Sequence, residues 1–158
     1  MKSPICAMLG VEFPLFAFSH CRDVVAAVSR AGGFGVLGAT THSPESIERE
    51  LTWIDDHVDG KPYGLDVLIP ENISTSGEKH VTWKSLEARV SPEHRAFTRN
   101  LLKKYDVELT TTPIPDTQPQ PFDSVRALEV LEASFRHPIR LIANALGVPP
   151  KSMIEITG

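Results

Sequence analysis

Short apolar runs alternate with amphipathic helical patterns along the first seventy residues, and this alternation limits the fold more than any other feature of the chain. The runs at 13–18, 34–38 and 63–68 are almost wholly apolar, as expected of strands buried on both faces of a parallel sheet. Apolar residues at helical spacing fill the intervals at 22–31 and 44–58. Because the links between these segments are short, the sequence predicts right-handed crossovers and therefore a parallel α/β fold.

The second half of the chain continues this pattern after a long interruption. Residues 138–144 fit a fourth strand, and Pro149-Pro150 leads into the start of a further helix. The interruption, 71–137, contains a polar stretch, a helical pattern from Ser91, a proline-rich linker at 110–121 and a helical pattern over 123–135. We therefore expect four βα strands with a helical and loop insertion between the third and the fourth. Because the pattern stops inside a repeating unit, we also expect a truncated reading frame.

The charge balance and cysteine usage exclude several classes of protein. The 158 residues include 16 Lys and Arg against 20 Asp and Glu, which argues against binding to nucleic acid or to an anionic membrane. No apolar run approaches the roughly 20 residues of a membrane helix, and the N-terminus does not resemble a signal peptide. Cys6 and Cys21 have no CxxC spacing, so we interpret them as reduced thiols of a cytoplasmic protein.

Polar residues follow each predicted strand at the point where it ends. Ligands of parallel α/β folds bind at the carboxyl ends of the strands, so these residues are candidates for one pocket rim. The candidates are Ser19, His20, Cys21, Thr40, Thr41, His42, Asp66 and Asn144. Each alone has a structural explanation, as a helix cap or a solvated loop residue, but the set favours a ligand site.

Three other apparent motifs carry less weight. The glycine run at 32–35 lies between a helix and the next strand, the wrong end for a phosphate loop, so it indicates a helix stop and close helix–sheet packing. We predict no metal site, because the histidines lack HxH and HxxxH spacing. Four of them are expected to face solvent: His57, His80, His94 and His137. Cys21 adjoins His20, but neighbouring residues rarely face each other, so thiol catalysis is not supported.

Several segments together resemble the opening of the nitronate monooxygenase family, formerly called 2-nitropropane dioxygenases. They are residues 13–19, 25–38 and 63–66. The most specific part is the small-residue helix that runs into Ala31-Gly32-Gly33-Phe34-Gly35. The resemblance covers residues 10–70 well and 139–150 more loosely.

The resemblance implies a (β/α) barrel of TIM type that binds FMN without a covalent bond. Residues 1–158 would then form its N-terminal half, with about the first four βα units and the insertion at 71–137. Members of the family oxidise alkyl nitronates with molecular oxygen and no metal. The implied partners are therefore a small nitronate-like substrate and O2, with FMN as the cofactor.

The same resemblance implies roles for individual residues. The loop after the first strand, which runs along the flavin in the family, corresponds here to Ala17, Phe18 and Ser19. A flavin-contacting polar residue on strand three, usually Asn, is here Asp66, and an ionised Asp only accepts hydrogen bonds. The substrate-side rim would comprise His20, Thr40, His42 and Asn144. The family's catalytic histidine comes from a later strand, is expected beyond residue 158, and aligns with neither His20 nor His42.

Other functions remain open from the sequence alone. One is a flavin-dependent enoyl reductase of the same superfamily, which would need a nicotinamide donor. Another is a non-catalytic barrel fragment that pairs with a partner chain. A flavodoxin-like binder is disfavoured, because residues 18–22 contain no glycine for a phosphate loop. Half a barrel leaves two strand edges and an apolar face uncovered, so we expect the isolated chain either to form a homodimer through those edges or to be poorly stable. We also expect the insertion to act as a lid over the flavin.

Overall fold

The computed structural model describes residues 3–69, 83–108, 124–145 and 147–157. Within these ranges the chain forms, in order, α1 (Pro4–Leu9), β1 (Phe16–Ser19), α2 (Arg22–Arg30), β2 (Phe34–Gly38), α3 (Pro44–His57), β3 (Tyr63–Val67), α4 (Trp83–Arg89), α5 (Pro92–Lys104), α6 (Ser124–Ser134), β4 (Leu141–Asn144) and α7 (Lys151–Thr157). No helix within the described ranges is long and apolar enough to cross a membrane.

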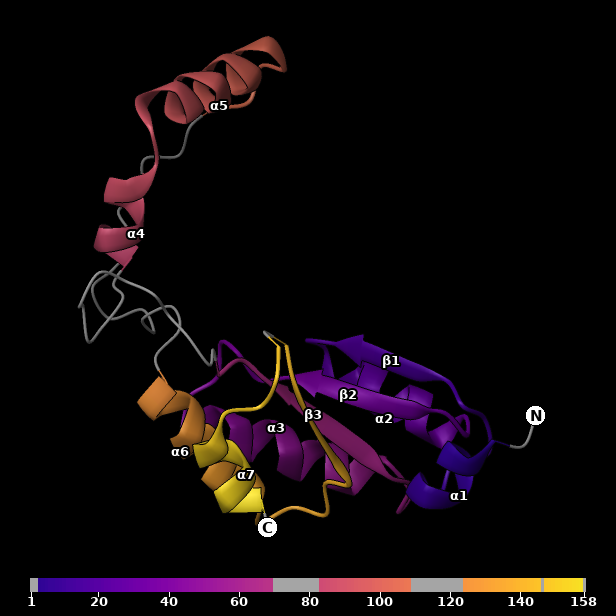
Figure 1. Ribbon diagram of the computed structural model, residues 1–158. Coiled ribbons are helices and arrows are strands. Elements are labelled where there is room, and N and C mark those ends of the chain that lie inside the picture. The colour runs from indigo at the N-terminus through magenta and orange to yellow at the C-terminus, as the bar shows by residue number, and fades with distance from the viewer. Residues whose placement is uncertain (1–2, 70–82, 109–123, 146, 158) are drawn as a thin grey trace. The chain divides into compact units, whose positions relative to one another are not determined.

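The strands form one parallel sheet in the order β1-β2-β3-β4 (Figure 1). This confirms the predicted α/β fold class and the four βα strands. β1 begins later than the predicted run at 13–18, because the backbone N–H groups of Glu12 and Phe13 both donate to the carbonyl of Gly32. These bonds fix the segment before β1 against the end of α2. α1 was not among the predicted elements.

Helices α2, α3, α6 and α7 cover one face of the sheet, where the larger core lies (Figure 1). Leu37, Leu65 and Val67 project from the strands into this core and are at most 2% exposed. α3, α6 and α7 supply most of the facing side chains, among them Ile47, Leu51, Ile54, Leu131 and Met153. On the opposite face, Leu9 of α1 packs with Phe34 and Val36 near the amino end.

Gly35 sets the distance between α2 and the sheet. A Cβ atom added there would lie 2.3 Å from the carbonyl oxygen of Val25, so only glycine fits at this position. The hydroxyl of Ser29 accepts a hydrogen bond from the Gly35 N–H at 3.1 Å and donates to the Pro62 carbonyl at 2.9 Å. Ser29 therefore joins α2 to β2 and to the start of β3. This confirms that the glycine run serves helix–sheet packing.

α3 begins where the sequence predicts, with Ser43 as its N-cap and Pro44 in its first turn. The Ser43 hydroxyl accepts from the Ser46 N–H at 3.1 Å, and the Ser46 hydroxyl accepts from the Ser43 N–H at 2.8 Å. α6 packs against α3, as the crossover helix between β3 and β4. It therefore belongs to the helical layer of the sheet, although the sequence places it within the 71–137 insertion.

The chain divides into two compact units, residues 1–73 with 124–158 and residues 74–123. The described part of the second unit consists of α4, which the sequence did not predict, and α5, which it did. The Ser91 hydroxyl accepts from the His94 N–H and so begins α5, in which Phe97 and Leu101 are exposed, as is Tyr105 at its C-cap. The proline-rich linker at 110–121 lies outside the described residues. The lid function of the insertion stays a prediction.

Candidate functional site

The sheet face turned away from the helices carries its side chains in rows that cross the strands. One row consists of Phe18, Val36, Gly64 and Leu141. The next row toward the carboxyl ends consists of Gly38, Asp66 and Ala143. The first row is mostly bulky and apolar, whereas the second has no side chain larger than a carboxylate. At the carboxyl end of this face, the strands therefore carry smaller side chains than in the row before.

The rings of His20 and Phe18 lie over Gly38 and occupy the space above it. A Cβ atom on Gly38 would fall 2.7 Å from the imidazole of His20 and 2.7 Å from the ring of Phe18. The two rings meet edge to face, with centroids 5.0 Å apart. Nδ1 of His20 lies 3.3 Å from the carbonyl oxygen of Gly38. The glycine thus allows an imidazole from the loop after β1 to reach the inner face of the neighbouring strand.

Asp66 is half-buried at the centre of the second row. Burial raises the pKa of its carboxyl above the ordinary value of 3.8, and the nearby His20 opposes this rise. A carboxyl with a raised pKa keeps its proton to a higher pH. In that state it offers both an O–H donor and a carbonyl acceptor, as an asparagine amide does with its N–H groups. The structure therefore brings together three of the predicted site residues, Phe18, His20 and Asp66.

Ala17 and Ser19 alternate with Phe18 and lie on the helix side of β1. The Ser19 hydroxyl accepts from the Cys21 N–H at 3.0 Å and so shapes the turn into α2. β1 is an edge strand of the described sheet, so part of its backbone points away from β2. This arrangement suits the expectation that residues 17–19 act through backbone groups.

Thr40 and His42 lie in the loop between β2 and α3. Thr40 is exposed. Nδ1 of His42 lies 3.1 Å from the hydroxyl of Ser46. The backbone carbonyl of His42 accepts from Nε of Arg126 at 3.4 Å. Burial lowers the pKa of His42 below 6.5, and this outweighs the attraction of Glu50. His42 is therefore held by α3 and α6, while a substrate-side role for either residue stays a prediction.

Asn144 joins the ends of β3 and β4. Its Oδ1 accepts from the Ile69 N–H at 2.9 Å, and its Nδ2 donates to the Ile69 carbonyl at 3.1 Å. The same amide nitrogen lies 3.4 Å from the carbonyl of Gly147. These bonds engage the whole amide with backbone, on the helix side of β4. Its substrate-side role stays a prediction.

His137 was expected to face solvent, and this is wrong, because its side chain is 6% exposed. Its Nδ1 lies 2.6 Å from one carboxylate oxygen of Asp55, and the Tyr63 hydroxyl donates to the other at 2.6 Å. Burial and the Asp55 carboxylate raise the pKa of Tyr63 well above its ordinary value. Asp55 and His137 are 82 positions apart, so no local motif indicates this network.

The network lies at the amino end of the sheet, beside a cavity of about 560 Å³ whose lining includes Asp55, Pro62 and Arg140. In TIM-type folds this end serves stability, whereas ligands bind at the carboxyl end. We therefore assign the network to the docking of α3 onto the strands. Among the described residues, no group of three or more His, Cys, Asp or Glu side chains is placed to hold a metal ion.

Comparison with known proteins gives a consistent family. The model of the nitronate monooxygenase family matches residues 2–111. A protein of Mycobacterium tuberculosis named "Putative monooxygenase Rv1533" is 43% identical over 163 residues, which cover 98% of this chain and 42% of that protein. A "Probable nitronate monooxygenase" of Staphylococcus saprophyticus is 30% identical over 101 residues, covering 61% of this chain and 27% of its own length. The chain thus spans less than half the length of these relatives.

Among solved structures, a nitroalkane oxidase from Streptomyces ansochromogenes superposes with a TM-score of 0.58 at 19% identity. The match covers 98% of this chain and 39% of that one. At this identity the likeness concerns the fold alone. It confirms that the described sheet is the four-stranded part of a TIM-type (β/α) barrel.

Proposed function

The chain belongs to the nitronate monooxygenase family, and from this premise we propose that it forms the flavin-ring side of an FMN-dependent oxidoreductase that oxidises alkyl nitronates with O2. Members of the family are flavin-dependent in general, and the family match therefore supports an oxidoreductase with a flavin. FMN as the flavin, and a nitronate as the substrate, belong to the proposal. The observation that supports it best is the row of Gly38, Asp66 and Ala143 at the carboxyl end of the sheet, with His20 and Phe18 packed over Gly38.

The residues at the carboxyl end suit a flat aromatic ligand. Gly38 and Ala143 add no large side chain on either side of Asp66, and the rings of His20 and Phe18 lie over Gly38. The edge backbone of residues 17–19 provides N–H and C=O groups next to these rings. When bound, the flavin would supply an acceptor for the electrons of the nitronate and a route for them to oxygen.

Asp66 would hold the ring through hydrogen bonds. In its protonated form it can both donate and accept, which compensates for the absence of the usual asparagine. His20, held over Gly38 with its Nδ1 3.3 Å from the Gly38 carbonyl oxygen, would lie beside the ring. We assign the removal of a substrate proton to neither His20 nor His42. The proposal also includes a cytoplasmic location, which cell fractionation would test.

Flavin retention tests the proposal directly. The purified 158-residue chain is mixed with FMN, desalted, and examined for the visible flavin band, and a retained band is followed by an assay of O2 consumption with a nitronate. Gly38→Val should abolish retention, since its side chain would displace the rings of His20 and Phe18 from their places beside Asp66. Thr52→Val, on the exposed side of α3, is the matched control. A folded chain that retains no FMN, or a Gly38→Val variant that retains it normally, would contradict the proposed site.

A further inference from the structure

The side chain of Asn144 forms hydrogen bonds where the backbone ladder between β3 and β4 ends. In the described part of the chain, the last backbone bond of this ladder runs from the Ala145 N–H to the Val67 carbonyl at 3.0 Å. Beyond it, the Asn144 amide accepts from the Ile69 N–H at 2.9 Å and donates to the Ile69 carbonyl at 3.1 Å. A side-chain amide offers the donor and the acceptor of a peptide group, so Asn144 acts as one more residue of the ladder.

These bonds keep the chain extended for two residues past the end of β3. Val67 and Ile69 both lie in the core beneath the helices, and each is 2% exposed. Side chains alternate between the two faces of an extended chain, so Leu68 lies on the opposite face, the one that carries Asp66. Leu68 is half-buried there. Asn144 therefore holds an apolar side chain in the place that follows Asp66 on the inner face of the sheet.

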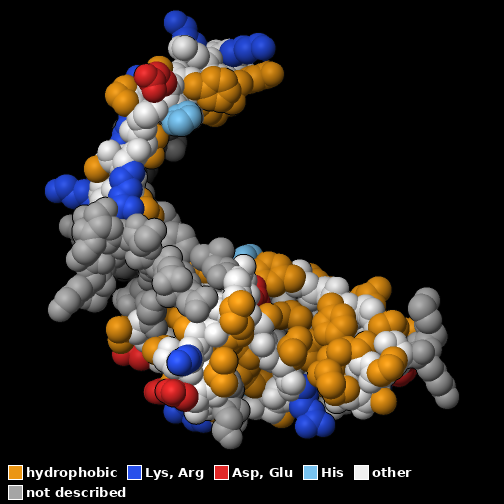
Figure 2. Space-filling view, viewed as in Figure 1, with side chains coloured by type: hydrophobic (Ala, Val, Ile, Leu, Met, Phe, Trp, Pro, Cys, Tyr) orange, Lys and Arg blue, Asp and Glu red, His pale blue; other side chains and the backbone are white. Residues whose placement is uncertain are grey.

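The surroundings of Asp66 on the inner face are largely apolar. The row of side chains before it is mostly bulky and apolar, and Figure 2 shows hydrophobic side chains gathered over the strands of this face. Burial raises the pKa of the Asp66 carboxyl, and the charge of His20 opposes this rise. The place of Leu68 therefore affects the balance between the two protonation states of Asp66.

We propose that Asn144 is a positioning residue for Asp66, because it prolongs the ladder to Ile69 and so holds Leu68 beside the carboxyl on the inner face. Asn144 acts from the helix side of the sheet, through the backbone, and contacts neither flavin nor substrate in this role. Under the proposed function, Asp66 bonds to the flavin ring, so Asn144 would also support FMN binding. Only this last consequence rests on the proposed function.

Asn144→Leu tests the proposal, because leucine has nearly the shape of asparagine and forms none of its hydrogen bonds. In the 158-residue chain, the Ile69 N–H should exchange with solvent deuterium roughly tenfold faster, as measured by NMR. The pKa of Asp66, followed by carbon-13 NMR of its carboxyl, should fall toward the ordinary value of 3.8. Asn100→Leu, at an exposed position of α5, is the matched control and should change neither quantity.

Leu68→Ala separates the two steps of the proposal. It leaves the bonds of Asn144 in place, so Ile69 should exchange as in the wild type, while the pKa of Asp66 falls as in Asn144→Leu. If Asn144→Leu does not fold, Asn144→Ser carries the same two expectations, because its short hydroxyl cannot reach both backbone groups of Ile69. Unchanged exchange of Ile69, or an unchanged pKa of Asp66 in the Asn144 variant, overturns the proposal.

FMN binding by the same variants separates this inference from the proposed function. If the wild-type chain binds FMN, Asn144→Leu should bind it roughly tenfold more weakly, and Asn100→Leu should bind it equally well. A wild-type chain that binds no FMN contradicts the proposed function, while the two NMR measurements still decide the role of Asn144. Equal binding by Asn144→Leu, despite a lowered pKa of Asp66, refutes the link between Asp66 and the flavin and supports the positioning role alone.

Discussion

Replacing Gly35 with alanine should loosen α2 from the sheet. The added Cβ would lie 2.3 Å from the Val25 carbonyl oxygen and 2.9 Å from the Val25 carbonyl carbon and Cα. All three are backbone atoms, so no side-chain rotation relieves the overlap. Ordinary contact begins near 3.4 Å, so α2 has to retreat by about 1 Å.

This retreat also affects Ser29. The Ser29 hydroxyl makes two hydrogen bonds, at 3.1 Å with the Gly35 N–H and at 2.9 Å with the Pro62 carbonyl. Both would lengthen to about 4 Å, which is too long for a hydrogen bond. Overpacking costs about 1–3 kcal/mol, and each lost bond of this buried hydroxyl adds about 1 kcal/mol. The expected loss is therefore about 3–5 kcal/mol, a large part of the 5–15 kcal/mol that keeps a typical domain folded.

Urea unfolding followed by far-ultraviolet circular dichroism measures this loss. With a slope of about 2 kcal/mol per molar urea, the midpoint of Gly35→Ala should fall by about 2 M. Gly38→Ala is the matched control. Its new Cβ meets the side chains of His20 and Phe18, which can rotate away, so its loss should stay below about 1 kcal/mol.

A double-mutant cycle with Ser29→Ala tests the mechanism. Gly35→Ala is expected to break both hydrogen bonds of Ser29 already. The loss of stability in the double variant should therefore be about 2 kcal/mol smaller than the sum of the losses in the two single variants. An unchanged midpoint for Gly35→Ala would refute the close approach of α2. Fully additive losses would refute the link through Ser29.

Two further perturbations address the ionisable groups. Asp55→Ala would leave the hydroxyl of Tyr63 and the imidazole of His137 without their carboxylate, so urea unfolding should show a loss of about 3 kcal/mol, against about 1 kcal/mol for Tyr63→Phe. A loss no larger than that of Tyr63→Phe would contradict the network. Burial raises the pKa of Asp66 in the folded state. Its contribution to stability is therefore fully present below pH 3.8 and is lost as the pH rises through the folded-state pKa. Asp66→Asn should therefore raise Tm at neutral pH and leave it unchanged near pH 3, and the opposite pH trend would contradict the burial of this carboxyl.

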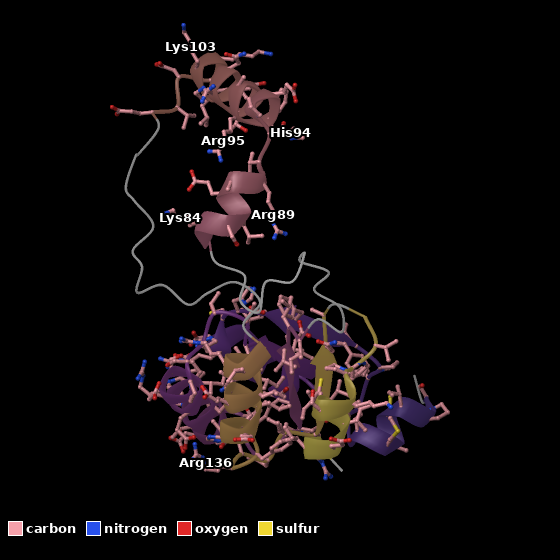
Figure 3. All side chains as sticks on the ribbon, turned by 60° about the vertical axis from the view of Figure 1, so that its left-hand side comes forward. Lys84, Arg89, His94, Arg95, Lys103 and Arg136 are labelled. Carbon is pink, nitrogen blue, oxygen red and sulfur yellow. The ribbon has the colours of Figure 1, made fainter. Side chains whose placement is uncertain are left out.

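The alternating pattern of the sequence was sufficient to predict the strands of the sheet and the helices that pack on it. Apolar runs of four to six residues with caps such as Ser43 specify these elements locally, because period and capping are properties of neighbouring residues. α1 and α4 were missed because each has only six or seven residues, too few for a helical period to show. Figure 3 labels the basic side chains of Lys84 and Arg89 on α4, and of Arg95 and Lys103 on α5.

The candidate site was only partly predictable, for a different reason. The rule that ligands bind at the carboxyl ends of parallel strands selected His20 and Asp66 correctly as neighbours. The same rule could not predict that the Asn144 side chain bonds to the backbone of Ile69, because this contact joins residues 75 positions apart. The burial of His137 depends in the same way on where α3 places Asp55.

The two ends of β2 explain how one short strand serves both packing and binding. Side chains alternate between the faces of a strand, so Gly35 and Gly38, three positions apart, lie on opposite faces. The first glycine admits the backbone of α2, and the second admits the rings of His20 and Phe18 beside Asp66. As letters in a sequence, the two glycines are equivalent, and only the register of β2 against β1 and β3 separates their roles. Substitution at Gly35 should therefore reduce stability in the absence of any ligand, whereas substitution at Gly38 should reduce flavin retention in a chain that remains folded.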